Sequence, residues 1–282
     1  MASSRVGLRF LHGRGAVGES CRGVAPWLCS TRQTSAGPPP STPSKPGSFG
    51  HKYDQFLGRY PRVYAIHRMI VDGSRWCLSD VKSFWNLRNV DVHKKEQLAK
   101  LSIPQLEILI QTRVELPRAV TVLVLAPLPF TVYIIAAAII LMPRLVLTRH
   151  FWSPTQRATF FNQDIETSRN RARSLAEIDL VDSIEKLPPA HVRSLSVLHG
   201  STFLGWPRSR LTSRFLLLRE LDRRLDVGEL STEQLRFHLQ LRRLASDGDN
   251  DAMRKTLRNW ISAARSVDSP PEYLRLPLKR SV

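Results

Sequence analysis

The stretch AVTVLVLAPLPFTVYIIAAAIILM, residues 119–142, decides how the rest of this chain is interpreted. Its 24 residues include no charged side chain, and it lies between Arg118 and Arg144. As a helix that rises 1.5 Å per residue, it would be about 36 Å long, against roughly 30 Å of bilayer hydrocarbon. The sequence therefore predicts that residues 119–142 form a single transmembrane helix.

Two other structures are weighed for this stretch. A buried helix of a soluble core would normally be shorter and would carry some charge. A re-entrant hairpin could turn at Pro127 and Pro129, but its first limb, residues 119–126, would be too short to span the bilayer. Because proline is tolerated in membrane helices when neighbouring groups satisfy the freed carbonyls, we expect a kinked spanning helix.

The side chains that flank the stretch are typical of a membrane interface, where basic and aromatic residues gather at the head groups. Basic residues near the two ends balance each other, so the positive-inside rule does not orient the span. We assign five residues to the interface: Arg118, Arg144, Arg149, Phe151 and Trp152.

Residues 1–48 have the composition of a mitochondrial transit peptide followed by a linker. They carry six basic residues against one acid, Glu19, and they contain no continuous apolar block of the kind a secretory signal needs. The segment GPPPSTPSKPG, residues 37–47, is typical of a flexible spacer. The alternative is a disordered cytosolic tail.

Residues 49–118 are expected to form an amphipathic helical region. Ile66, Ile70, Gly73, Cys77 and Val81 recur at helical spacing among many arginines. Such a helix could lie on a membrane surface with its basic side toward anionic lipid, or it could pack on a protein partner. The sequence does not separate these two alternatives.

Residues 143–276 are expected to form a bundle of helices, and residues 277–282 a tail. Ser153 with Gln156, and Ser231 with Gln234, have the spacing of helix-capping boxes. Apolar stripes run from Leu211 to Leu225 and from Met253 to Ala264, and alternation typical of strands is nearly absent. The predicted fold class is therefore mostly α, a single-pass membrane protein with a helical-bundle carboxyl domain.

The sequence contains no pattern that indicates catalysis, a metal site or a cofactor. Asp247, Asp249 and Asp251 have the spacing of a calcium loop, but Ala252 stands where glycine is needed and Arg258 where a glutamate ligand is needed. We interpret this turn as a helix N-cap. We expect a protein that is not an enzyme and that has no metal or cofactor.

The predicted span also lacks the polar groups of an ion path. Its polar side chains are Thr121, Thr131 and Tyr133, and none is ionised at neutral pH. Residues 136–138, three alanines, would allow close helix approach, so a homo-oligomer is possible in principle. Several copies would still supply no carboxylate.

Three segments together resemble the LETM-domain family, the leucine-zipper and EF-hand transmembrane proteins of the mitochondrial inner membrane. They are LIQTRVELPRAVTVLVLAPLPF at 109–130, Pro143 with FWSPT at 151–155, and LSTEQLRFHLQLRRLASDGDNDAMRKTLRNWI at 230–261. FLGRYPRVY at 56–64 and RHFWSPTQ at 149–156 are most similar to the short members of the family. The similarity extends from about Tyr53 to Leu276.

The resemblance implies an inner-membrane protein whose carboxyl domain, called ribosome-binding-like in the family, lies in the matrix. It also implies roles in mitochondrial organisation, cation and proton exchange, or respiratory-chain assembly. The long members carry an acidic residue near the end of their span, and this chain does not. That difference weakens the expectation of cation exchange.

The leading hypothesis is a membrane anchor protein whose helical domain binds the mitochondrial ribosome or respiratory-chain assembly factors. The net charge of +18 is compatible with anionic lipid or RNA-rich partners, although ordinary solubility would also explain it. A cation/proton exchanger, or a subunit of one, and a membrane-shaping scaffold are the alternatives. The predicted partner-binding residues are Arg208, Arg210, Arg214, Arg223, Arg224, Arg236, Arg242 and Arg243.

Overall fold

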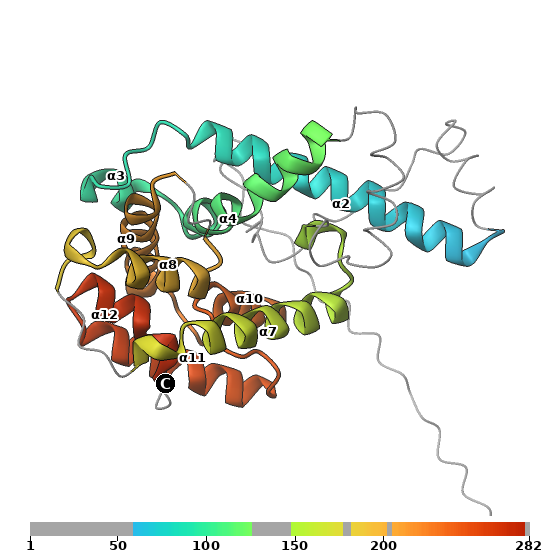
Figure 1. The fold of residues 1–282 in the computed structure, drawn as a ribbon. Coiled ribbons are helices and arrows are strands. Elements are labelled where there is room, and N and C mark those ends of the chain that lie inside the picture. The colour runs from blue at the N-terminus through green and yellow to red at the C-terminus, as the bar shows by residue number, and fades with distance from the viewer. Residues whose placement is uncertain (1–58, 126–147, 177–181, 202–204, 280–282) are drawn as a thin grey trace, which may run out of the picture. The chain divides into compact units, whose positions relative to one another are not determined.

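The computed structural model describes residues 59–125, 148–176, 182–201 and 205–279, which all belong to one compact unit formed by residues 34–282. Within these ranges the regular structure is entirely helical (Figure 1), which confirms the mostly α class. The predicted transit peptide and most of the predicted span, residues 126–142, lie outside the described residues. None of the described helices is both long and apolar enough to cross a bilayer, so single-pass topology stays a prediction.

The described helices follow each other with short connections. The α-helices are α2 (Pro61–Asn86), α3 (Lys95–Lys100), α4 (Ile103–Leu125), α7 (Pro154–Arg171), α8 (Pro189–Leu198), α9 (Pro207–Arg224), α10 (Thr232–Leu241), α11 (Asn250–Arg265) and α12 (Pro270–Arg275). The 3-10 turns are η1 (Arg149–Phe151), η2 (Arg173–Ala176), η3 (Ile184–Lys186) and η4 (Leu276–Leu278).

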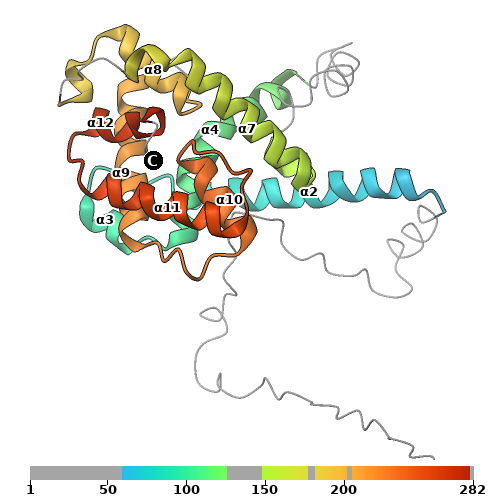
Figure 2. The same ribbon diagram turned by 90° about the horizontal axis from the view of Figure 1, so that it is seen from below.

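Helix α9 lies in the middle of the fold, in contact with α3, α4, α8, α11 and α12 (Figure 2). Its residues Leu211, Leu218 and Leu221 are completely buried, as the apolar stripe in the sequence predicts. Leu106 and Leu109 of α4 belong to the same core. Helices on both sides of residues 126–147 therefore share one hydrophobic interior.

Helix starts follow the capping patterns in the sequence. The side chains of Ser153 and Ser231 accept the backbone N–H of Gln156 and Gln234, which complete both capping boxes. Asp249 accepts the N–H of Ala252 at 2.7 Å and begins α11. The acidic turn is thus a helix cap, as predicted.

The amphipathic helix α2 packs on its own chain. It contacts α4 and η1, and Trp76 is buried. At Gly73 an added Cβ would lie 2.6 Å from the carbonyl oxygen of His150, so the close approach of η1 requires glycine at this position. In the described structure this face of α2 is used for internal packing, an arrangement that the sequence did not distinguish from lipid or partner contact.

Four charged side chains fasten this junction. Arg149 of η1 is 1% exposed, and its Nη2 donates to Asp80 of α2 at 2.7 Å. Its Nε lies 3.3 Å from Glu115 of α4. His150 Nε2 lies 3.1 Å from the same Asp80 oxygen, and the Arg149 guanidinium stacks over the Trp76 ring. The junction joins residues on both sides of the apolar stretch through short ionic contacts.

The carboxyl half is organised around one buried acid, Asp222 of α9. Its Oδ1 accepts Nε of Arg242 at 2.8 Å and a second bond from Nη2 of the same guanidinium. Its Oδ2 accepts Trp260 Nε1 at 3.0 Å and the Tyr273 hydroxyl at 2.5 Å. Arg242, Trp260 and Tyr273 are all completely buried. We call Asp222 and these three partners the Asp222 cluster, and it joins α9 to α10, α11 and α12.

A second buried arginine, Arg214, is held by neutral partners. Its Nε donates to His199 Nδ1 at 3.1 Å and its Nη2 to the carbonyl of Leu241 at 2.7 Å. His199 Nε2 in turn donates to the carbonyl of Leu274 at 2.8 Å. Burial and the charge of Arg214 lower the pKa of His199 well below its ordinary value. His199 is therefore neutral, with Nδ1 as acceptor.

Two helices end in Schellman motifs beside this arginine. Gly200 (φ +65°) follows α8, and Ser201 N–H donates to the carbonyl of Ser196. Arg243 (φ +60°) follows α10 in the same geometry, although glycine is the usual residue there. Arg243 Nε donates to Leu198 O and its Nη1 to Asp164, and these contacts hold its backbone in the left-handed region.

We predict that Asp222→Ala lowers the free energy of unfolding by about 3–5 kcal/mol, because it leaves a buried guanidinium without its counter-charge. Urea unfolding of the full chain, followed by circular dichroism, measures the change. Asp247→Ala, at an exposed site, is the matched control and should have little effect. Equal midpoints for the two variants would contradict the role assigned to Asp222.

We further predict that the protein loses stability as the pH falls below the ordinary pKa of histidine. The pKa of His199 is lower in the folded state than in the unfolded state, so its contribution is complete above the unfolded value and is lost on acidification. The slope contributed by this one group should approach about 1.4 kcal/mol per pH unit. Urea midpoints between pH 7.5 and 5 measure it, and His199→Gln should flatten the profile.

Candidate partner-binding groove

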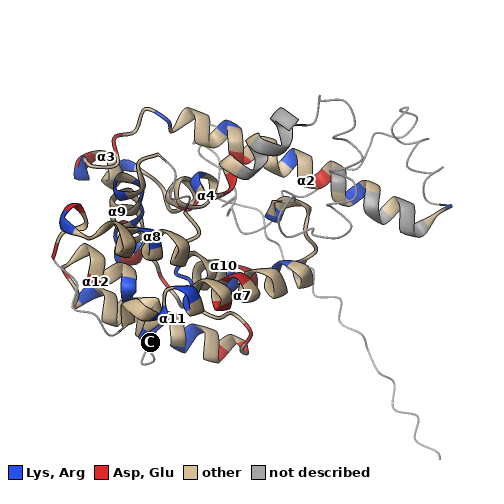
Figure 3. Ribbon diagram, viewed as in Figure 1, with Lys and Arg blue, Asp and Glu red and all other residues tan. Residues whose placement is uncertain are grey.

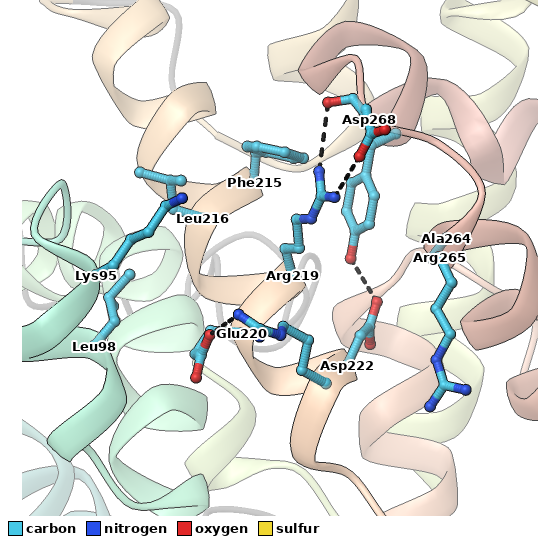
Figure 4. A pocket seen from close by; sticks show the side chains of 12 residues that line it. Lys95, Leu98, Phe215, Leu216, Arg219, Glu220, Asp222, Ala264, Arg265 and Asp268 are labelled. Atoms are coloured by element: carbon cyan, nitrogen blue, oxygen red, sulfur yellow. Dashed lines mark hydrogen bonds and ion pairs between the residues drawn. The ribbon is translucent and has the colours of Figure 1, made fainter.

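A groove of about 770 Å³ opens beside α9, between α3, the end of α11 and the start of α12 (Figure 4). We call it the α9 groove. Its floor is apolar and its rim is charged. The described residues that line it are Lys95, Leu98, Phe215, Leu216, Arg219, Glu220, Asp222, Arg223, Ala264, Arg265, Asp268 and Tyr273.

The floor of the groove is fixed by the Asp222 cluster. Tyr273 meets the ring of Phe215 edge-on at 5.2 Å between centroids, and the Tyr273 hydroxyl donates to Asp222. Burial, followed by the charge and hydrogen bond of Asp222, raises the pKa of Tyr273 well above its ordinary value. Tyr273 is therefore a neutral, immobilised wall and not a proton carrier.

The acids of the groove are already paired within the protein. Arg219 donates to Asp268 at 2.7 Å, and Arg242 neutralises Asp222 from inside. Glu220 is bound by Arg224, whose guanidinium also donates to the carbonyls of Leu101 and Leu98 at 2.6 and 3.0 Å.

Three exposed cations remain on the rim: Lys95, Arg223 and Arg265. Arg223 lies 3.5 Å from Glu220, but its side chain is 72% exposed, so this pair is weak. Figure 3 shows basic residues along α9 and at the end of α11. The rim is therefore net positive and suits an acidic partner surface.

The groove has the chemistry of a binding site. No cysteine, serine or histidine is among the described residues that line it. In the described part of the chain no cluster of histidine, cysteine and carboxylates could hold a metal. Recognition by charge and by an apolar floor is what the arrangement can perform.

The eight predicted binding arginines occupy very different environments. Arg242 and Arg243 are buried with Asp222 and Asp164, and Arg214 is buried against His199. The partly buried members are Arg208, which donates to Leu187 O at 2.7 Å, Arg224, and Arg236, beside Glu233. Arg210 and Arg223 are exposed. The structure brings Arg223, but not the buried three, to the α9 groove.

The predicted interface residues are also divided. Arg149 and Trp152 are buried, and Phe151 is half-buried beside Gly73. The backbone of Arg118 lies in α4, while its side chain and all of Arg144 are outside the described residues. Head-group contact by this set stays a prediction.

Sequence reasoning missed Lys95, Arg219 and Arg265 as members of one surface. Arg265 ends α11, where a basic residue complements the helix dipole, and this position is a signal that could have drawn attention to it. Lys95 begins a short helix more than a hundred residues before α9. Only the fold brings it to the groove.

Comparison with known proteins places this fold in a family. Residues 101–186, from the end of α3 to η3, match the family model described as LETM1-like, RBD. LETM1 domain-containing protein 1 of Xenopus tropicalis is 29% identical over 168 residues, which cover 55% of this chain and 47% of the relative. The human protein of that name is 22% identical over 275 residues, covering 79% of this chain and 76% of the relative.

No solved structure matches the chain. The chain spans about half the length of the Xenopus relative that it matches. Most of the α9 groove, including Arg219, Arg223 and Arg265, lies beyond the residues covered by the family model. With the sequence similarity to LETM1 domain-containing protein 1 in two species and the match over 101–186, the chain belongs to the LETM-domain family.

Proposed function

We propose that this protein is attached to the mitochondrial inner membrane and binds the mitochondrial ribosome through the α9 groove. The observation that carries the proposal is the cationic rim of Lys95, Arg223 and Arg265 around an apolar floor. It lies on the helical body that contains the LETM1-like segment. A ribosome offers both phosphate and acidic protein surface to such a rim.

The buried arginines narrow the surface that can take part. Arg214, Arg242 and Arg243 hold the interior together, so their replacement would test folding and not recognition. Arg223 and the two rim cations that sequence reasoning missed are accessible. These three residues are therefore the ones to reverse.

We expect the triple variant with Lys95→Glu, Arg223→Glu and Arg265→Glu to weaken co-sedimentation with mitochondrial ribosomes at least tenfold near 0.1 M salt. Loss of three cation contacts should also reduce the slope of log affinity against log salt by about 2. The reference variant reverses three exposed cations outside the groove, Arg171, Lys255 and Arg258, and has the same net charge. If both triple variants lose binding equally, general charge and not the groove is responsible.

The packing of the junction bears on how the apolar stretch meets the membrane. Glu115 before it and Arg149 after it are 3.3 Å apart, and Asp80 and Arg149 are 2.7 Å apart. A single crossing would place roughly 30 Å of hydrocarbon between these residues. We therefore propose that residues 119–142 attach the protein with both flanking regions on one side of the membrane. This proposal replaces the single-pass arrangement expected from the sequence.

We expect single cysteines at Lys100 and at Asp247, both exposed, to react with a membrane-impermeant maleimide in the same fraction. The background carries Cys21→Ser, Cys29→Ser and Cys77→Ala. Labelling is compared in intact mitochondria, mitoplasts and detergent-lysed mitoplasts. If one site reacts in mitoplasts and the other only after lysis, the stretch crosses the membrane and the proposed arrangement is wrong. The exchanger and membrane-shaping alternatives stay predictions.

A further inference from the structure

We propose that a cavity between α2, α4 and α9 binds one anionic phospholipid, with its phosphate against arginines and an acyl chain along α4. We call it the α4 cavity. Its volume is about 420 Å³, within the range of small-molecule sites. The inference rests on the membrane attachment proposed above and is independent of ribosome binding.

The walls of the α4 cavity suit a hydrocarbon chain. Most of its described lining is apolar and comes from the two helices that face each other across the space. These residues are Phe84 of α2, Leu109, Ile110, Val114, Leu116, Pro117 and Val120 of α4, and Leu217 of α9. Val120 is 46% exposed, which leaves the α4 side of the cavity open.

The polar part of the lining is cationic. Arg113, Arg210 and Arg214 line the cavity together with Ser201, and no carboxylate is among its described lining residues. The α9 groove is different, because its acids are paired with its own arginines. The α4 cavity therefore presents positive charge that an anionic ligand would complement.

Arg214 gives the strongest reason to expect an anion. Its hydrogen-bond partners, His199 and Leu241 O, are uncharged, and its Nη1 has no hydrogen-bond partner among the described residues. Burial and the nearby charge of Arg243 lower its pKa to about 9. A buried guanidinium without a carboxylate is costly, and a phosphate diester would supply the missing counter-charge.

The acids near Arg214 are engaged elsewhere. Glu115 and Asp164 line a small cavity that also contains Arg214. Glu115 accepts Gln111 Nε2 at 2.7 Å and pairs with Arg149, while Asp164 pairs with Arg243 at 2.8 Å. Neither forms an ion pair with Arg214 among the described contacts. The counter-ion must therefore come from outside the described residues.

Position along the chain favours a lipid as the source of this phosphate. Leu116, Pro117 and Val120 lie on the last turns of α4, which leads directly into the uncharged residues 126–142. If that stretch enters the bilayer, the α4 cavity lies at the membrane surface. Anionic head groups and acyl chains are then the molecules at hand.

The test uses the full chain, delipidated in a neutral detergent, with phosphatidylglycerol, phosphatidylcholine or inorganic phosphate as the probe. Native mass spectrometry counts bound lipid. We expect one phosphatidylglycerol per chain and at least tenfold weaker binding of phosphatidylcholine. Inorganic phosphate should not displace the lipid at equal concentration. Equal binding of the two lipids, or displacement by phosphate alone, would overturn the proposal.

Two variants locate the site. Arg113 is exposed and has no ion pair among the described contacts, so Arg113→Gln should keep the fold and weaken phosphatidylglycerol binding about tenfold. Val120→Trp should obstruct the acyl chain and abolish the one-to-one adduct. Arg258→Gln, exposed on α11, is the matched control and should bind like the wild type. Unchanged binding in both cavity variants would overturn the assignment.

The same variants separate this inference from the proposed function. Arg113→Gln should leave ribosome co-sedimentation and resistance to carbonate extraction unchanged. A cavity filled by another part of this chain would give no lipid adduct in the wild type, and Val120→Trp would then lower the melting temperature. That result would reject the lipid site and leave ribosome binding to be decided by the groove variants.

Discussion

The rest of the structure depends on the bond between Asp222 and Arg242. Neither side chain has appreciable access to water, so each charge is tolerable only because the other is present. The two free acceptor directions of Asp222 are used by Trp260 and Tyr273, which bring α11 and α12 onto α9. The floor of the α9 groove is the outer surface of this arrangement. Fold and binding surface are thus set by one carboxylate.

Arg149 plays a comparable part at the other end of the body. Asp80 and Glu115 approach it from α2 and α4, and Phe237 of α10 lies under its guanidinium. A pair of carboxylates around one arginine is electrically acceptable because His150 and Gln111 share the load of hydrogen bonds. The consequence is topological. Helices that the sequence separates by an uncharged stretch become neighbours, which is hard to reconcile with a bilayer between them.

Local features of this fold could be predicted from the sequence, and long-range pairings could not. Helical stripes around Leu211 and Met253 and the caps at Ser153, Ser231 and Asp249 depend on neighbours within four residues, and each is confirmed. The partner of Arg242 is twenty residues away, and that of Arg149 sixty-nine. Nothing in helical spacing distinguishes a guanidinium that faces water from one that meets a buried acid. The candidate site was therefore predicted in character, a basic helix face, and only at Arg223 in position.

This difference changes how the basic composition should be interpreted. A net charge of +18 suggests a uniformly cationic surface, but arginine here also acts as an internal connector whose five donors reach carbonyls and acids on several helices. Arg214 is the exception that sharpens the point, because it is buried like Arg242 yet lacks an acid. Where an arginine is buried and paired, it stabilises the fold. Where it is buried and its partners are neutral, the protein holds a charge in reserve, and the anion that complements it defines a site.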